Sequence, residues 1–182
     1  MTALRFWLGS LLVGLVAVSA SAQSRDIAVE GMRAEKRIAL VIGNSGYASS
    51  PLKNPVNDAR AMARTLRSLG FEVIARENVG EKEMRRAILD FGDRLQGGGV
   101  GLFFFAGHGM QVGGRNFLVP IGAEIRSERE VELEAIDVAR VLGRMEEAKN
   151  RLNIVVLDAC RSGRRNPEPT TCSRTCRSVP TR

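Results

Sequence analysis

The sequence predicts an α/β domain with a mostly parallel sheet and helices on both of its faces. Short apolar runs alternate with segments of helical periodicity, and the runs lie at residues 37–42, 71–75, 100–106 and 152–157. Each run is apolar at consecutive positions, which is typical of strands buried on both faces. Right-handed crossovers then place the carboxyl ends of the strands at one edge of the sheet, where sites in such folds form.

The first run, RIALVI, ends at Gly43-Asn44 and predicts a buried strand, and the Ser-, Pro- and Asn-rich residues 45–55 predict a loop. A two-residue hairpin is expected at Gly113-Gly114, between residues 110–112 and 116–119. The last strand is expected to end at Asp158.

Three helices are expected between the strands. The first is capped by Asn57 and stopped by Gly70, and the second covers residues 81–95. The third follows a charged loop and is capped by Asp137. Apolar residues recur at helical spacing in all three: Met62, Leu66 and Leu69; Met84, Ile88, Phe91 and Leu95; Val138, Val141, Leu142 and Met145.

The two ends of the chain have a different composition. Residues 6–18 form an uncharged apolar run after Arg5, and Ala20 and Ala22 give a cleavage pattern of small residues. We therefore expect a signal peptide over residues 1–22 and export to the periplasm or outside the cell. The alternative is a membrane anchor, but the run of 13 residues is shorter than the roughly 17–25 that a spanning helix needs. A linker is expected over 23–36, the catalytic-type domain over 37–163 and a disordered basic tail over 164–182.

The net charge of +7 is mostly a property of the tail. Six Arg against one Glu give residues 161–182 a charge of +5, and Arg5 adds one, which leaves +1 for residues 23–160. No nucleic-acid-binding motif is present, so nucleic acid is not expected as a partner.

Of the three cysteines, Cys172 and Cys176 are candidates for a disulfide in an oxidising compartment. Their spacing and the single histidine do not make a zinc site, and we expect no metal or cofactor. Cys160 is the odd cysteine.

His108 and Cys160 are candidates for a catalytic pair, because each follows a predicted buried strand of the same parallel sheet. A thiolate that attacks a carbonyl and an imidazole that moves protons are what nucleophilic acyl transfer needs. The backbone amides of Gly109 and Cys160 are candidates for binding an oxyanion. Taken singly, such a histidine is more often a loop residue and such a cysteine a small buried hydrophobe.

The local motifs strengthen this interpretation. His108 precedes Cys160 by 52 residues, and Asp158-Ala159-Cys160-Arg161 is similar to the caspase signature around the nucleophile. The segments RIALVIGNSGY, LKNPVNDARAMARTLRSLGF, FFFAGHGMQVGGRNFLVP and IVVLDACRSG occur in family order. Over residues 36–163 the chain resembles the caspase-like cysteine peptidases, most closely the bacterial metacaspase-related branch.

The resemblance implies a caspase-like three-layer sandwich and a cysteine endopeptidase, with Cys160 as nucleophile and His108 as general acid/base. It also implies that Asp58 and Asp158 bind a basic side chain, so that cleavage follows Arg or Lys. The ordinary alternatives are helix capping for Asp58 and a strand-end turn for Asp158. The resemblance leaves any calcium requirement open.

The resemblance stops soon after Cys160, where family members add further strands. We therefore expect a sheet that is truncated after the fourth main strand, with an open apolar edge liable to pair with another chain. The chain would then be inactive alone, or would need a partner chain that completes the sheet.

Two other functions have weaker support in the sequence. One is a non-catalytic caspase-like interaction module with the same fold. The other is a phosphate- or nucleotide-binding protein, which the sequence disfavours because residues 43–46 lack a P-loop or dinucleotide pattern.

Overall fold

The computed structural model describes residues 35–161, with side chains up to residue 159. The predicted signal peptide, nearly all of the predicted linker, the basic tail, Cys172 and Cys176 lie outside the described residues. The elements are, in order, β1 (Arg37–Gly43), α2 (Pro55–Ser68), β2 (Glu72–Glu77), α3 (Glu81–Leu95), β3 (Val100–Val112), β4 (Arg115–Leu118), α4 (Glu128–Glu134), β5 (Ile136–Asp137), α5 (Val138–Glu147) and β6 (Leu152–Arg161).

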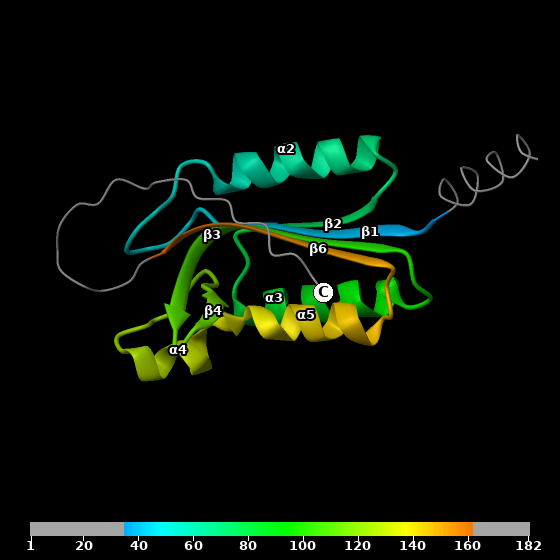
Figure 1. Cartoon of the computed structure of the whole chain (residues 1–182). Coiled ribbons are helices and arrows are strands. Elements are labelled where there is room, and N and C mark those ends of the chain that lie inside the picture. Colours follow the sequence, from blue (N-terminus) through cyan, green and yellow to red (C-terminus); the bar gives the residue numbers. More distant parts are fainter. Residues whose placement is uncertain (1–34, 162–182) are drawn as a thin grey trace, which may run out of the picture. The chain divides into compact units, whose positions relative to one another are not determined.

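The strands form a mixed sheet that is parallel over its main part. The order β2-β1-β3 is parallel, β6 continues it in parallel on the other side of β3, and β4 and β5 extend it in antiparallel fashion from the far end of β3. Helix α2 covers one face, and α3 and α5 cover the other (Figure 1). The predicted fold class is confirmed.

Each face of the sheet has its own core. On the α2 face, Val41, Leu66 and Phe104 are buried, together with small residues of α2 such as Ala59 and Ala63. The other face buries larger side chains against α3 and α5: Leu40, Phe91, Phe103, Phe105 and Met145. Burial of each such large side chain contributes roughly 1.5–3 kcal/mol to folding, so consecutive apolar residues in one strand stabilise both layers.

Helix α2 begins earlier than Asn57, because Pro55 occupies its first turn, where a residue without an N–H is well tolerated. The Oγ atom of Ser45 accepts the N–H of Val56 at 3.2 Å and caps the helix from the preceding loop. After the helix, Gly70 has a φ of +80°, as expected for the residue that ends it. Helix α3 and the Asp137 cap of α5 are confirmed.

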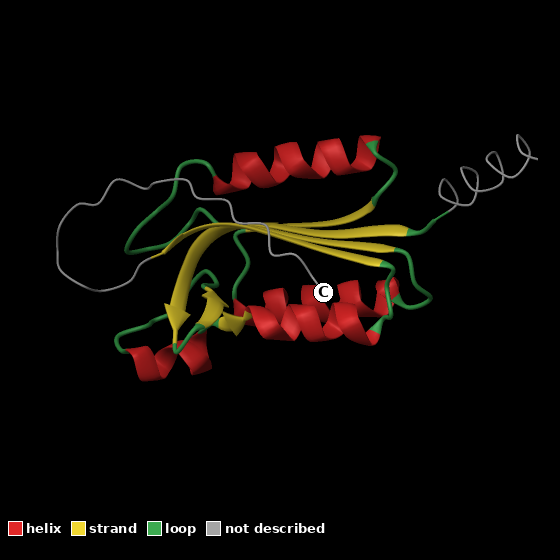
Figure 2. Ribbon diagram, in the orientation of Figure 1, coloured by secondary structure: helices red, strands yellow, loops and turns green. Residues whose placement is uncertain are grey.

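Strands β3 and β6 are longer than predicted, and this changes the setting of the candidate pair. His108 and Cys160 lie inside these strands and not in turns after them. The reason is that β3 gains an antiparallel partner, β4, from Gly109 onward, while its ladder with β6 continues to Arg161. The end of β3 that pairs with β4 bends out of the main sheet (Figure 2). The hairpin turn at Gly113-Gly114 is confirmed, with φ values of +56° and +80°.

The charged loop before α5 contains two elements that the sequence did not predict, α4 and the short β5. Helix α4 packs on the β3–β4 hairpin through one small apolar cluster, whose buried members are Phe117, Val131 and Ala135. Within residues 35–161, no helix combines the length and the apolar character that crossing a membrane requires.

Candidate active site

The candidate catalytic residues lie on neighbouring parallel strands at matching positions. In the β3–β6 ladder, the Cα partner of His108 is Cys160. Adjacent strands are about 4.8 Å apart, so the two backbones are in direct contact and no strand intervenes. Positions 102, 104 and 106 of β3 belong to the α2 face of the sheet. His108 continues this alternate set, and Ile154 and Val156 of β6 belong to the same face.

The imidazole of His108 is held in one orientation. Its Nε2 atom lies 2.8 Å from the backbone oxygen of Ser50. A carbonyl oxygen can only accept, so the hydrogen bond requires the proton on Nε2, and in the neutral imidazole Nδ1 then carries a lone pair. Nδ1 is buried and has no hydrogen-bond partner among the described residues. This atom is the one available for proton transfer.

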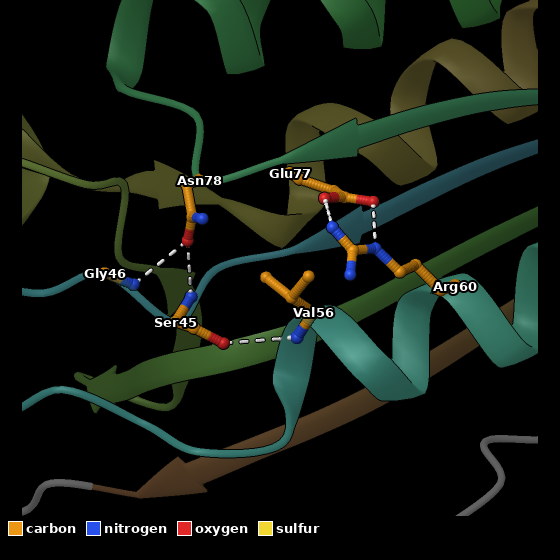
Figure 3. A network of polar contacts seen from close by, with 6 residues as sticks. All are labelled: Ser45, Gly46, Val56, Arg60, Glu77 and Asn78. Carbon is orange, nitrogen blue, oxygen red and sulfur yellow. Dashed lines mark hydrogen bonds and ion pairs between the residues drawn. The ribbon is translucent and has the colours of Figure 1, made fainter.

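The loop that supplies the Ser50 oxygen is fixed by three side chains. Asn44 is fully buried; its Oδ1 accepts the N–H of Val79 at 3.0 Å, and its Nδ2 donates to the Val79 oxygen at 3.2 Å. The Tyr47 hydroxyl donates to the oxygen of Val119 at 2.9 Å. Asn78 accepts the N–H groups of residues 45 and 46 at 2.8 and 2.9 Å (Figure 3). The loop is therefore tied to two other segments of the chain, at residues 78–79 and at Val119.

The same view shows how the start of α2 is joined to β2. The guanidinium of Arg60 donates two hydrogen bonds to the carboxylate of Glu77, at 2.8 and 2.7 Å (Figure 3). The hydrogen bonds from Arg60 lower the pKa of Glu77 from its ordinary value. Sequence reasoning missed Asn44, Tyr47 and Asn78. Asn44 directly after a buried strand, and Tyr47 as the only tyrosine, were the available indications.

The two predicted specificity carboxylates lie near the same rung of the sheet, that is, near one row of residues that are register partners on neighbouring strands. Asp158 is the partner of Ala106, and Ala106 is in turn the partner of Gly43. A Cβ atom on Gly43 would lie 2.6 Å from both the Cβ of Ala59 and the backbone oxygen of Pro55, so the first turn of α2 packs directly on this rung. Asp58 belongs to that first turn. The rung spans two strand spacings, so the backbone of Asp158 is about 10 Å from Gly43.

Asp58 is half-buried and Asp158 is exposed. Within residues 35–161, neither carboxylate makes a side-chain hydrogen bond or an ion pair. The structure thus brings two uncompensated carboxylates to the edge of the sheet that carries His108.

Gly109 lies inside the sheet, between Leu118 of β4 and Arg161 of β6. A Cβ atom at this position would approach the Cβ of Ala159 to 2.9 Å, so glycine allows β6 to come close. The oxyanion role of the Gly109 and Cys160 amides stays a prediction. Within the described part of the chain, no three side chains of the His, Cys, Asp or Glu type gather in a way that could hold a metal ion.

The parallel sheet, the helices on both faces and the matched His108 and Cys160 positions define a caspase-like α/β sandwich. A family model described as "Caspase domain" matches residues 36–180, and the chain belongs to this family of cysteine peptidases.

Two curated relatives match in sequence. These are the human mucosa-associated lymphoid tissue lymphoma translocation protein 1 and its mouse homolog, each 37% identical over 131 residues. The match covers 70% of this chain and 15% of each relative, so the chain spans a small part of their length. A solved structure, protein GSU0716 from Geobacter sulfurreducens, shares the fold with a TM-score of 0.56 at 20% identity. That alignment covers 70% of this chain and 52% of the other.

Proposed function

We propose that this chain carries the catalytic region of a cysteine endopeptidase, with Cys160 as nucleophile and His108 as general acid/base. The observation that carries the proposal is the pairing of His108 with Cys160 in the β3–β6 ladder. The second support is the state of the imidazole, whose Nε2–H is bound to the Ser50 oxygen and whose Nδ1 has no hydrogen-bond partner among the described residues.

The reaction follows from this state. The Cys160 thiol gives its proton to Nδ1, and the thiolate attacks the carbonyl carbon of the scissile peptide, so that a C–S bond forms. The imidazolium returns the proton to the amide nitrogen as the C–N bond breaks, which releases the amine and leaves a thioester. Water then gives a proton to Nδ1 as its oxygen attacks the thioester. The C–S bond breaks and the imidazolium returns the proton to the Cys160 sulfur, which releases the carboxylic acid and restores the thiol.

Cleavage after Arg or Lys is part of the proposal. Two carboxylates that have no charged partner within residues 35–161 favour a basic side chain. The shared rung of Asp158 and the α2 first turn supports a joint role. A guanidinium can bridge two carboxylates, because its five donors point in several directions.

The test uses the full chain in which Cys172 and Cys176 are serine, so that Cys160 is the only thiol. Peptidyl alkylating agents that end in Arg, Lys or Asp are compared by the rate at which they label Cys160. We expect labelling by the Arg and Lys agents, loss of labelling in His108→Ala, and a selective loss of the Arg preference in Asp158→Ala. A preference for the Asp agent would refute the basic pocket, and equal labelling of His108→Ala would refute the catalytic pair.

One observation favours a second candidate, a caspase-like module that is silent until another chain binds. In the described range, β6 has no strand on its outer side, and its residues 153–157 are only half-buried although four of them are apolar. We propose that a strand of a partner chain covers this edge. Assays of the isolated chain, with and without a full-length relative, distinguish the candidates: robust cleavage by the monomer would contradict the need for a partner.

Export is also proposed, from the apolar segment at residues 6–18. Sequencing the amino terminus of the expressed protein tests it, since cleavage after Ala22 would leave Gln23 as the first residue.

A further inference from the structure

Strand β3 changes partners at the position of His108. On one side its ladder with β1 ends at Ala106, and its ladder with β4 begins at Gly109. Gly107 and His108 therefore have no strand residue beside them on that edge. Elsewhere in the sheet such backbone groups are satisfied by a neighbouring strand, so an interruption here needs another partner.

A side chain supplies that partner. The hydroxyl of Tyr47 accepts the backbone N–H of His108 at 3.0 Å and donates its own proton to the backbone oxygen of Val119 at 2.9 Å. The N–H of Val119 in turn donates to the oxygen of His108 at 3.0 Å. The hydroxyl thus joins the end of the β1–β3 ladder to the chain that leaves β4.

The aromatic ring of Tyr47 also contacts the imidazole. The two ring centroids are 4.4 Å apart with an interplanar angle of 54°. Tyr47 and Ser50 belong to the same loop, so one segment fixes the backbone of His108, limits the tilt of its ring and receives its Nε2–H.

The surroundings of the Tyr47 hydroxyl keep it protonated and close to the backbone of His108. Tyr47 is 7% exposed, and burial raises its pKa to about 12, so near neutral pH it keeps the proton that it donates. A Cβ atom on Gly107 would lie 2.7 Å from the Tyr47 hydroxyl and 2.8 Å from the Phe105 ring. Only glycine at position 107 leaves room for this approach.

We propose that Tyr47 is a positioning residue for His108, which keeps the Nε2–H on the Ser50 oxygen and thereby keeps Nδ1 free for proton transfer. The tyrosine acts through the histidine and transfers no proton in the reaction. The effect of Tyr47 on the reaction of Cys160 rests on the proposed function, whereas its effect on the tautomer of His108 does not.

His108 is the only histidine of the chain, so the nitrogen chemical shifts of one imidazole report its tautomer without assignment. The full chain with Cys160 as its only thiol is compared with its Tyr47→Phe and Tyr47→Leu variants. Phe71→Leu is the matched control: this half-buried aromatic precedes β2 at the amino end of the sheet and packs in the α2-face core, away from His108.

In the parent chain we expect the Nε2–H tautomer. Tyr47→Phe keeps the ring and loses the hydroxyl, so the tautomer should be retained while Cys160 labelling slows about 2- to 10-fold, the effect of one hydrogen bond. Tyr47→Leu loses both contacts, and we expect a mixture of tautomers, slower labelling than in Tyr47→Phe and a shifted pH profile. Phe71→Leu should leave the tautomer and the pH profile unchanged.

A Tyr47→Leu protein with the parent tautomer and the parent pH profile would overturn the proposal. If Tyr47→Leu does not fold, Tyr47→Phe decides, and a parent labelling rate in that variant would count against positioning. If the parent chain is not labelled at all, the proposed function fails while the tautomer comparison still tests Tyr47.

Discussion

The two strands that carry the candidate pair differ in how they are held. Strand β3 is central: β1 and β6 flank it, and residues 100–107 are buried. The Tyr47 hydroxyl and the Ser50 backbone oxygen, both from a separate loop, fix its histidine. In the described part of the chain, β6 has a neighbour on one side only, and its Leu152 is 40% exposed. The imidazole is thus positioned by groups within residues 35–161, whereas the proposed nucleophile, Cys160, lies on a strand with a single described neighbour.

This difference separates two requirements of a catalytic pair. A general acid/base needs a fixed tautomer and orientation, which short-range contacts supply. A nucleophile in a substrate cleft also needs the walls of that cleft, and on the outer side of β6 no described strand supplies them. We therefore expect changes in β3 to have larger effects on stability than changes in β6.

The largest effect is expected at the pair itself. With Cys172 and Cys176 replaced by serine, Cys160→Ser and His108→Ala should each lower turnover by about a thousandfold or more. Hydrolysis of a fluorogenic Arg peptide measures turnover, and circular dichroism shows that the variants remain folded. Residual turnover in Cys160→Ser equal to that of the parent would exclude Cys160 as nucleophile.

A pair of core variants compares the two strands directly. Phe105 and Leu157 are register partners on the same face, but Phe105 is fully buried and Leu157 is not. Phe105→Ala should cost about 3–5 kcal/mol of the free energy of unfolding, because a large cavity forms in the core. Leu157→Ala should cost less than about 2 kcal/mol, because the Leu157 side chain is only partly buried and its burial removes less apolar area from water.

Urea unfolding of the two variants measures the difference. Equal costs would mean that something other than the described residues covers β6. Strand β6 would then be as well covered as β3.

A smaller effect is expected at Gly107. Gly107→Ala places a methyl group against the Tyr47 hydroxyl and the Phe105 ring, which should cost about 1–3 kcal/mol by overpacking. Gly143→Ala is the control, because this glycine lies inside α5 and nothing is within 4 Å of its Cβ position. That substitution should stabilise the helix by up to about 1 kcal/mol. Thermal unfolding of both variants checks that the two changes in stability have opposite signs. Destabilisation by both substitutions would contradict overpacking as the specific cost at Gly107.

The smallest effect is expected in alkali. Because the pKa of Tyr47 is raised to about 12, its contribution to stability is complete below its unfolded value near 10 and is lost as the pH rises toward 12. The loss amounts to about 2 kcal/mol, and Tyr47→Phe should remove this part of the pH dependence. Tyrosinate absorbance follows the ionisation directly, because the chain has one tyrosine. Ionisation near pH 10 in the folded protein would refute the burial argument.

The main sheet and the helices could be predicted from the sequence because their patterns are local. Consecutive apolar residues in residues 37–42 and 100–106, and the helical spacing in residues 81–95, require no knowledge of the rest of the chain. Gly70 and Asp137 also act within one turn of the helices that they end and begin.

What the sequence did not predict depends on contacts between distant segments. The extension of β3 past His108 needs β4, and the extension of β6 needs β3. The start of α2 is set by Pro55 together with a cap from Ser45, ten residues earlier in the chain. At the site, His108 could be selected by type and spacing, but the roles of Asn44 and Tyr47 arise from hydrogen bonds that span 35 to 75 residues.

The interruption in the β3 ladder also provides a means to observe the loop. The amide hydrogen of Phe105 lies in a continuous parallel ladder, whereas that of His108 is bound by a hydroxyl. Movement of the loop over residues 44–54 would release the second amide to solvent and leave the first protected. Hydrogen exchange at this one amide therefore reports how often the loop opens, independently of substrate, inhibitor or turnover.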